Sequence, residues 1–335
     1  MSRSGYSLKI TVILCTYNRC ESLPRALESV AASTVPSSVE WEVLVVDNNS
    51  KDKTRVVVQE FCDRYPGRFR YFLEPLQGLS NARNSGIREA RGDIVVFVDD
   101  DVTVEPAWLQ NLTAELLDGK WAGSGGRIRP HEGFVPPDWL NLGGEFYLSG
   151  SLVLFDLGDN ACELDQPPFG TNMAFQRAMF EKYGGFRADL GRCGNRLIGN
   201  EETEFAQRLK AGGEHLWYAP SAVVYHPVPE QRLKKSYLRR WWYSYGRSVI
   251  RQTGKGPSIR EVPGFYLRRL KGGLRWMFFS NPDWPLYPDW RFYAEIQVCV
   301  AAGEIVEILR LARQKASNDK AAVRGSRELS SHNPW

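Results

Sequence analysis

The sequence predicts an α/β fold in which a mostly parallel sheet is flanked by helices and followed by a C-terminal helical extension. Three observations predict it. Apolar strand-like runs alternate with helix-like repeats between Ile10 and Asp99, which is typical of successive βαβ units. These runs end in polar residues, at the edge where open α/β sheets bind ligands. From Lys234 onward, aromatic and basic residues recur at helical spacing.

The strands and helices alternate regularly up to Asp99. Runs rich in Val, Ile and Leu predict strands, and apolar residues recurring every three or four positions predict helices. Gly92 ends the last of these helices. We expect strands at 8–14, 41–47, 70–74 and 93–99, and helices at 21–30, 56–61 and 79–91.

After Pro106 the pattern becomes mixed. A Gly-rich stretch covers 123–130, and a Pro-rich loop follows it. Asn200 is the expected N-cap of a later helix. We expect a helix at 107–117, a strand-like run at 151–157, a strand, turn and short helix within 169–186, a helix at 199–213, and one or two closing strands at 214–228.

The composition is that of a globular protein. Of the 335 residues, 43% are hydrophobic and 24% are charged, which suits one large domain or two smaller ones. The six cysteines lack CxxC spacing, so neither a zinc site nor a disulfide framework is indicated, and no signal peptide is evident. We therefore expect a reducing, cytoplasmic location. The polar segment 313–335 is expected to be a disordered tail.

Polar tips follow three of the predicted strands, namely "CTYNR" at 15–19, "DNNS" at 47–50 and "DDD" at 99–101. Three adjacent carboxylates repel one another unless they are solvated or bound to a cation. Oxygen ligands suit a hard divalent cation, Mg²⁺ or Mn²⁺. If the segment stays extended, Asp99 and Asp101 share one face and point to one ligand. The alternative is a solvated acidic turn.

Several motifs occur in a fixed order between about Ile10 and His226. They are "VILCTYNR", "LVVDNNSKD", "GLSNARNSGIREARGDIVVFVDDD", "GTNMAF", "GGF", "GNEETEFAQRLKAGG" and "YAPSAVVYH". In this order they resemble the inverting family 2 glycosyltransferases, which have a GT-A fold. The resemblance implies transfer of a sugar from a nucleotide-sugar donor, most often a UDP-sugar, to an acceptor hydroxyl.

The resemblance implies that the first two polar tips hold the nucleotide, through Thr16, Tyr17, Arg19 and Asp47. Asp47 can accept a hydrogen bond from a uracil N–H, and Tyr17 can stack on the base. Arg83 is implied to contact the diphosphate or a base edge. The alternatives are an ordinary turn aromatic for Tyr17 and a surface ion pair for Arg83.

The resemblance also implies the metal and sugar ligands. Asp101 binds the divalent cation directly, Asp99 reaches the ribose or a metal-bound water, and Asp100 is a donor-site residue without a defined contact. His226 is implied as an additional metal ligand, with a structural histidine as the alternative. Asn172 is implied to contact the sugar, with an asparagine that satisfies a turn as the alternative.

The attacking hydroxyl must lose its proton, so the chemistry needs a carboxylate as general base. The motif "GNEETEF" supplies Glu202 at the position where the family has Asp, and the neighbouring Glu201 is the substitute candidate. Glu is one methylene longer than Asp. The alternative is structural, because Glu201, Glu202 and Glu204 in a first helical turn after Asn200 favour the helix dipole in any protein.

Basic character is concentrated in one segment. Between Gln231 and Arg275 there are 13 Lys and Arg residues and one acidic residue, Glu261, while acidic residues outnumber basic ones elsewhere. A helix within 234–280 is expected to lie on an anionic membrane surface, since no apolar run reaches the ~20 residues of a span. The alternative is packing against the protein, and nucleic-acid binding is disfavoured because no such motif accompanies the charge. An amphipathic helix at 294–313 suits self-association or closure of the fold.

These expectations divide the chain into four parts: a nucleotide-sugar-binding half at 1–102, an acceptor-binding and catalytic half at 103–229, a basic aromatic extension at 230–312 and the tail at 313–335. Two other functions were considered. A nucleotidyltransferase also uses acidic metal ligands, but it would carry a Gly-rich phosphate loop near the N-terminus, and a basic aromatic binding protein would not need the intact carboxylates. A Rossmann dehydrogenase is excluded because no GxGxxG follows the first strand.

Overall fold

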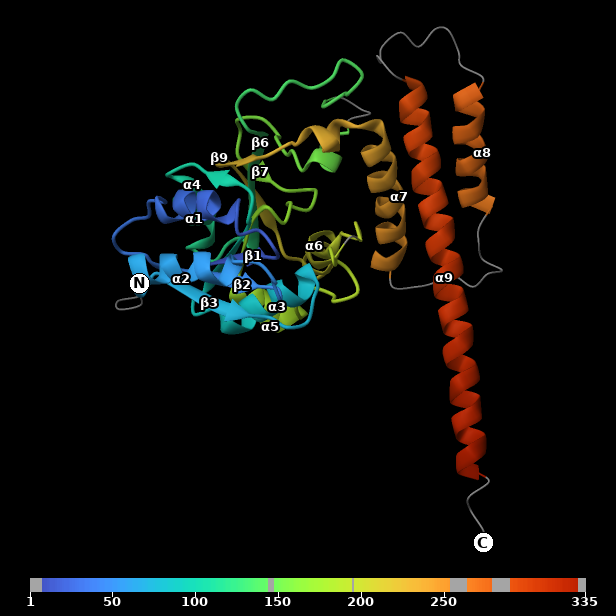
Figure 1. The fold of residues 1–335 in the computed structure, drawn as a ribbon, viewed down its shortest axis with the longest axis horizontal. Helices are drawn as coiled ribbons and strands as arrows, with labels where there is room; N and C mark the ends of the chain where they lie inside the picture. The colour runs from blue at the N-terminus through green and yellow to red at the C-terminus, as the bar shows by residue number, and fades with distance from the viewer. Residues whose placement is uncertain (1–7, 144–147, 195, 254–263, 279–289, 331–335) are drawn as a thin grey trace. The chain divides into compact units, whose positions relative to one another are not determined.

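The computed structural model divides the chain into two compact units (Figure 1). The sheet unit comprises Met1–Arg196 and Asn200–Leu233, and the helical unit comprises Leu197–Gly199 and Lys234–Trp335. Residues 8–143, 148–194, 196–253, 264–278 and 290–330 are described.

The expected α/β architecture is confirmed in the sheet unit. Its sheet has nine strands in the described residues, in the order β3-β2-β1-β4-β8-β6-β9-β5, with β7 paired to β9. The first four strands of this order are parallel, as βαβ connections require, and β8 is antiparallel to both of its neighbours. The strands are β1 (Lys9–Thr16), β2 (Glu40–Asp47), β3 (Phe69–Leu73), β4 (Ile94–Asp99), β5 (Thr103–Val104), β6 (Gly123–Pro130), β7 (Cys162–Glu163), β8 (Asn172–Gln176) and β9 (Leu216–His226).

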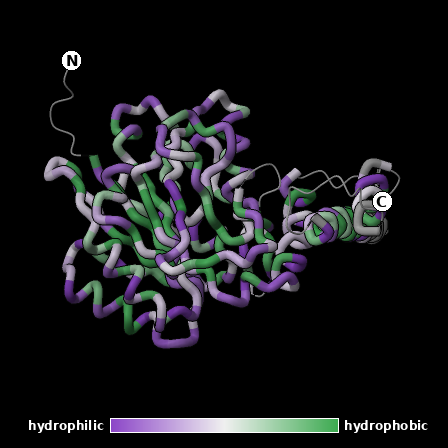
Figure 2. Tube along the Cα trace, turned by 90° about the horizontal axis from the view of Figure 1, so that it is seen from above, coloured by the Kyte–Doolittle hydropathy of each residue, from purple (hydrophilic) through white to green (hydrophobic). Residues whose placement is uncertain are grey.

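The helices of the sheet unit pack beside this sheet, and the clearest apolar stripe is that of α1. In α1, Leu23, Ala26, Leu27 and Val30 are buried, as their spacing predicts. In Figure 2 the apolar residues gather in the interior and the polar ones line the loops. The helices are α1 (Leu23–Ala31), α2 (Thr54–Arg64), α3 (Leu79–Glu89), α4 (Trp108–Thr113), α5 (Arg177–Tyr183) and α6 (Glu201–Ala211), with short 3-10 turns at Ala114–Leu116, Ser149–Leu152 and Glu230–Leu233.

A cluster of phenylalanines joins α5 and α6 to the sheet. Phe180 and Phe205 stack with ring centroids 4.4 Å apart, and Phe97, Phe175 and Phe186 pack around them. Aromatic pairs of this kind contribute about 0.5–1.5 kcal/mol each beyond the area they bury. The cluster therefore fixes α6, the helix that carries the predicted base.

Two segments differ from the sequence expectations. The Gly-rich stretch forms β6, an interior strand, because glycine is required there: a Cβ on Gly126 would lie 2.3 Å from Nδ2 of Asn172. The strand-like run at 151–157 is not a strand. Ser149–Leu152 is a 3-10 turn, and Val153 takes a left-handed conformation with φ of 60°, which breaks the extended run.

The helical unit contains α7 (Lys235–Gln252), α8 (Gly264–Phe278) and α9 (Trp290–Ser330). Helix α7 runs parallel to α9, since Arg239 pairs with Glu295 near the start of both helices and Arg251 pairs with Glu307 further along. The two backbones meet at glycines, because a Cβ on Gly303 would lie 2.0 Å from the carbonyl oxygen of Tyr243. Within the described residues, none of the helices combines the length and the hydropathy that a membrane span requires.

The C-terminal segment also differs from expectation. Helix α9 continues to Ser330, through most of the segment 313–335 that was expected to be a disordered tail. Its Ala, Lys, Arg, Glu and Leu residues have high helix propensity, and extending an existing helix carries no nucleation cost. Composition alone does not reveal this, because a solvated helix and a disordered segment are equally polar.

Candidate active site

The three polar tips meet at one edge of the sheet, as predicted. Strands β1, β2 and β4 are parallel neighbours, so their carboxyl ends coincide. Thr16 is in register with Asp47, and Cys15 is in register with Asp99. This edge is where ligands bind in open α/β sheets.

Asp47 is buried at the end of β2 and held by two donors. Its Oδ1 accepts a hydrogen bond of 2.8 Å from the backbone N–H of Ser50, and its Oδ2 accepts one of 2.9 Å from the hydroxyl of Tyr71. Burial and the Asp47 charge raise the pKa of Tyr71 to about 12, so Tyr71 remains a donor. Each carboxylate oxygen keeps a further lone pair that can accept from a ligand.

The tip of β1 exposes an aromatic ring and a cation. Thr16 is buried, whereas Tyr17 is 39% exposed. The guanidinium of Arg19 has its Nη2 3.6 Å from Oδ2 of Asp101. The first polar tip is thereby linked to the aspartate turn.

The three aspartates do not form an extended segment. Strand β4 ends at Asp99, and Asp100 and Asp101 lie in a turn. The extended backbone on which the pairing of Asp99 with Asp101 was predicted is therefore absent after Asp99. Asp99 accepts a hydrogen bond from the hydroxyl of Thr171, whereas Asp101 faces Arg19 and His226.

Negative charge in this turn is incompletely neutralised. Burial and the Asp101 charge raise the pKa of Asp100 to about 7. Burial and Asp99 likewise raise the pKa of Asp101, against the opposing charges of Arg19, Arg232 and Arg192. Such a turn favours a bound cation.

His226 ends β9 and is buried beside this turn. Its Nε2 lies 4.0 Å from Oδ1 of Asp101 and 3.3 Å from Nη1 of Arg232. Burial and the Arg232 charge lower the pKa of His226, which keeps the ring neutral. Its Nδ1 is buried and has no hydrogen-bond partner among the described residues. A neutral imidazole is the form that ligates metals.

The residues present fit a divalent cation that takes some of its ligands from the protein and the others from a substrate and water. No group of three or more His, Cys, Asp or Glu side chains in the described part of the chain is arranged to hold a metal alone. Asp101 and His226 lie together, however, and Mg²⁺ and similar ions commonly use one or two protein ligands with substrate phosphates and water.

Arg83 is buried and joins two elements far apart in sequence. Its Nη1 donates a 2.7 Å hydrogen bond to Oε1 of Glu201, and its Nη2 lies 3.7 Å from Oδ1 of Asp99. Only glycine fits beside the guanidinium, because a Cβ on Gly170 would lie 2.2 Å from Nη2. The surface ion pair considered for Arg83 is thus wrong.

Glu201 and Glu202 open α6 in different environments. Glu201 is buried in the ion pair with Arg83. Glu202 is half-buried, and its Oε2 has no hydrogen-bond partner within the described residues. Burial and the Glu201 charge raise the pKa of Glu202, with Arg83 opposing. Asn200 stands at the N-cap with φ of 71° but makes no side-chain cap hydrogen bond.

Asn172 does not fit the sugar contact implied for it. The side chain is completely buried, and its Oδ1 accepts from the indole N–H of Trp108 at 2.8 Å. Its Nδ2 donates to the carbonyl oxygens of Arg127 and Ala222. These three bonds use the amide to join β8, β6, β9 and α4. They support a structural role for Asn172 in place of a contact with the sugar.

Sequence reasoning missed four side chains beside the predicted ones: Tyr71, Thr171, Arg192 and Arg232. Thr171 precedes Asn172 in the motif, and its hydroxyl is the signal that was available. Tyr71 is visible only through the pairing of β3 with β2. Arg192 lies in a loop and Arg232 in the 3-10 turn Glu230–Leu233, and neither place is indicated by a periodic pattern.

The chain matches the family model described as glycosyl transferase family 2 over residues 11–184. It is 29% identical over 270 residues to the succinoglycan biosynthesis protein ExoM of Rhizobium meliloti, covering 80% of this chain and 83% of the relative. It is also 29% identical over 253 residues to the glucosyl-dolichyl phosphate glucuronosyltransferase of Haloferax volcanii, covering 72% of this chain and 77% of the relative.

Among solved structures, the fold is similar to that of a mannosyltransferase from Pyrobaculum calidifontis in complex with GDP-Man and Mn²⁺. The TM-score is 0.54 at 20% identity, and the match covers 98% of this chain and 82% of that one. The similarity shows a shared GT-A fold.

Proposed function

The chain belongs to glycosyl transferase family 2 and is a glycosyltransferase, and on this premise we propose that it is a metal-dependent, inverting enzyme that moves a sugar from a UDP-sugar to an acceptor hydroxyl. The bridge that Arg83 makes between Asp99 and Glu201 carries this proposal. It ties the aspartate turn to the first turn of α6, which holds Glu202. Family membership replaces the nucleotidyltransferase interpretation.

The donor is recognised at the ends of β1 and β2. Asp47 accepts the uracil N–H, since Ser50 and Tyr71 already orient its carboxylate. Tyr17 stacks on the base, which its exposure supports. Arg19 binds the diphosphate.

Asp101 and His226 would hold the divalent cation, Mn²⁺ or Mg²⁺, and Asp99 would contact the ribose or a water on the cation. A bound cation supplies Lewis-acid stabilisation of the departing diphosphate. The raised pKa of Asp100 and Asp101 supports this assignment, because burial and the neighbouring carboxylates outweigh the charges of the nearby arginines.

Glu202 is the general base, and Glu201 positions it. Oε1 of Glu201 accepts a hydrogen bond from Arg83, so this carboxylate holds the bridge to the aspartate turn. Burial and the Glu201 charge raise the pKa of Glu202, which strengthens Glu202 as a base toward the acceptor hydroxyl. Attack from the side opposite the diphosphate inverts the anomeric centre.

The acceptor is a carbohydrate or a lipid-linked sugar in cell-surface polysaccharide or glycolipid synthesis, and transfer takes place at the cytoplasmic face of the membrane. Two relatives support this assignment by name, one in succinoglycan biosynthesis and one that acts on glucosyl-dolichyl phosphate.

Thermal shift tests the donor site. UDP with Mn²⁺ or Mg²⁺ should raise the melting temperature of the full chain, because a ligand that binds only the folded state stabilises it. EDTA should remove the shift, and so should Asp101→Ala, whereas Asp63→Ala on the surface of α2 should retain it. An unchanged shift in Asp101→Ala would refute the metal assignment. A panel of nucleotide sugars, assayed for release of UDP, then identifies the donor.

A further inference from the structure

The outward face of α8 combines exposed leucines with basic side chains. Leu267 is 46% exposed and Leu274 is 39% exposed. Arg268, Lys271 and Arg275 are exposed as well. Positions 267, 268, 271, 274 and 275 follow helical spacing, so the five side chains lie on one face. We call it the α8 face.

The opposite side of α8 is used for packing. Arg269 is paired with Glu304 of α9 at 2.7 Å, and a Cβ on Gly273 would lie 2.8 Å from Cγ2 of Val298. These contacts fix the rotation of α8 about its axis. The α8 face is therefore directed away from α9.

Helix α8 carries no acidic residue, so the three cations of the α8 face have no neutralising partner on their own helix. Helix α7 differs. Its Arg239, Arg247 and Arg251 are paired with glutamates of α9. These three cations of α7 are thus neutralised by α9, whereas those of the α8 face have no carboxylate on their own helix.

We propose that the α8 face docks this glycosyltransferase on an anionic lipid surface. The cations complement anionic headgroups, and the leucines enter the region between headgroups and acyl chains. Exposed leucines distinguish this surface from one that binds nucleic acid, where aromatic rings stack on bases beside the cations. The inference rests on the proposed function in one respect: docking would hold the enzyme at the membrane that carries a lipid-linked acceptor.

Co-sedimentation of the full chain with vesicles tests the proposal without donor, metal or turnover. The protein should bind vesicles containing anionic phosphatidylglycerol and leave neutral phosphatidylcholine vesicles unbound at the same salt concentration. Binding should fall as salt is raised. Because no nucleotide is present, failure here leaves the proposed chemistry untouched, and failure of transfer leaves docking untouched.

Two variants separate the contributions of charge and apolar contact. Arg268→Gln/Lys271→Gln/Arg275→Gln should weaken binding at least ~tenfold, since each basic side chain near an anionic surface adds to the attraction. Leu267→Ser/Leu274→Ser should weaken it independently of salt. A control variant, Arg64→Gln/Lys120→Gln/Lys210→Gln, removes three exposed charges of the sheet unit and should bind as the parent does.

Retained UDP binding and an unchanged melting curve would show that the α8 variants remain folded. Equal binding of neutral and anionic vesicles, or equal binding by the α8 and control variants, would overturn the proposal. So would loss of self-association in the α8 variants with vesicle binding unchanged, because the face would then serve a second copy of the chain.

Discussion

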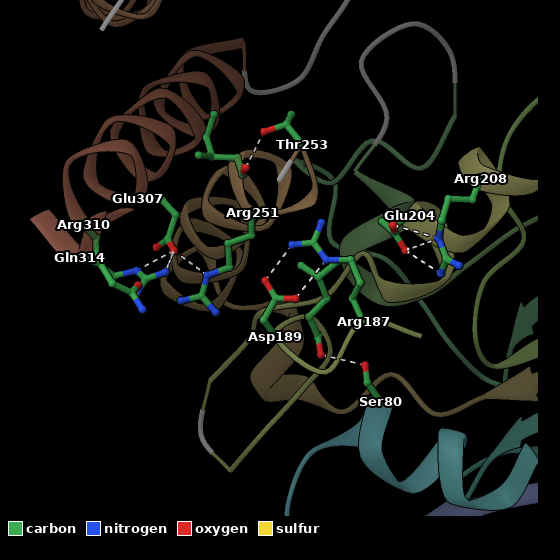
Figure 3. A network of polar contacts seen from close by, with 12 residues as sticks. Ser80, Arg187, Asp189, Glu204, Arg208, Arg251, Thr253, Glu307, Arg310 and Gln314 are labelled. Atoms are coloured by element: carbon green, nitrogen blue, oxygen red, sulfur yellow. Dashed lines mark hydrogen bonds and ion pairs between the residues drawn. The ribbon is translucent and has the colours of Figure 1, made fainter. Parts of the chain in front are cut away.

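Arginines and glutamates meet in two regions of this molecule, with opposite results. In the helical unit, Glu307 is completely buried and accepts hydrogen bonds from Arg247, Arg251 and Arg310, two of which are labelled in Figure 3. Burial alone would raise the pKa of Glu307, but these hydrogen bonds outweigh it and lower the pKa.

In the active site the balance is reversed. Burial and a neighbouring carboxylate raise the pKa of Glu202, and one oxygen of this side chain lacks a partner in the described residues. The difference is that Glu307 has an arginine donor for each of its oxygens, whereas Glu202, the candidate base, has one oxygen without a donor in the described residues. Four predictions test this contrast.

The largest effect is expected from Glu202→Gln. Loss of the general base should lower kcat by roughly 10³-fold while UDP binding is retained. Single-turnover assays with the donor identified above measure the change. Glu204→Gln is the matched control in the same helical turn, where Glu204 pairs with Arg208, and its turnover should be close to that of the parent. Normal turnover in Glu202→Gln would assign the base to another residue.

Glu307→Gln should be the most destabilising of the variants. Removing this charge takes the counter-charge from three partly exposed arginines, Arg247, Arg251 and Arg310. A hydrogen bond to a charged group contributes about 1.5–3 kcal/mol, and three such bonds would be weakened together. Urea unfolding followed by circular dichroism measures the loss. Glu295→Gln removes the partner of Arg239 at a more exposed pair and should cost less than about 1 kcal/mol. Equal losses in the two variants would mean that burial and the three arginines give Glu307 no more weight in stability than the single, more exposed pair of Glu295.

Gly170→Ala should disturb the bridge between the two halves of the site. The added methyl group would stand 2.2 Å from Nη2 of Arg83, so the guanidinium must move from Asp99 and Glu201. Overpacking of this kind costs about 1–3 kcal/mol, and kcat should fall with it. Gly150→Ala is the control, since its nearest neighbour is 3.9 Å away. A loss of stability with unchanged kcat would show that Arg83 does not position the base.

The pH dependence of stability should have opposite signs in the two regions. Glu202 has a folded pKa above its ordinary value of 4.5. Its contribution to the free energy of unfolding is therefore fully present below pH 4.5 and is lost as pH rises through the folded pKa. Glu307 has a lowered pKa, so its contribution is present above pH 4.5 and is lost as pH falls. Each unit of pKa shift corresponds to about 1.4 kcal/mol.

Melting temperatures of the parent, Glu202→Gln and Glu307→Gln between pH 4 and pH 8 measure this difference. The parent should lose stability relative to Glu202→Gln as pH rises, and should gain stability relative to Glu307→Gln. If both stability differences changed in the same direction with pH, the predicted contrast between Glu202 and Glu307 would be wrong.

The sequence predicted those strands and helices whose formation depends on the pattern of neighbouring residues. The strands β1, β2 and β4 and the helix α1 follow from apolar periodicity, and the meeting of their polar tips follows from parallel pairing. Strand β6 was not predicted, because its glycines are required by side chains that approach from other strands, such as Asn172. A local sequence pattern does not show such contacts.

The site was predicted as a set of residues but not as a set of contacts. The backbone turn after Asp99, the burial of Arg83 and the structural use of Asn172 depend on tertiary packing. The basic segment shows the same limit, because its net charge is visible in the sequence whereas its pairing with α9 depends on which helix faces point inward.

The bridge between Arg83 and Glu201 also has a consequence for synthesis of the chain. Its two ends are 118 residues apart, and a ribosome adds roughly 5–20 residues per second, so the partner of Arg83 is made several seconds after it. During that interval β1 to β4 can pair, but the arginine has no glutamate to receive it. The nascent chain cannot form this bridge until α6 has left the exit tunnel, so the candidate site is completed only after β1 to β4 have been made.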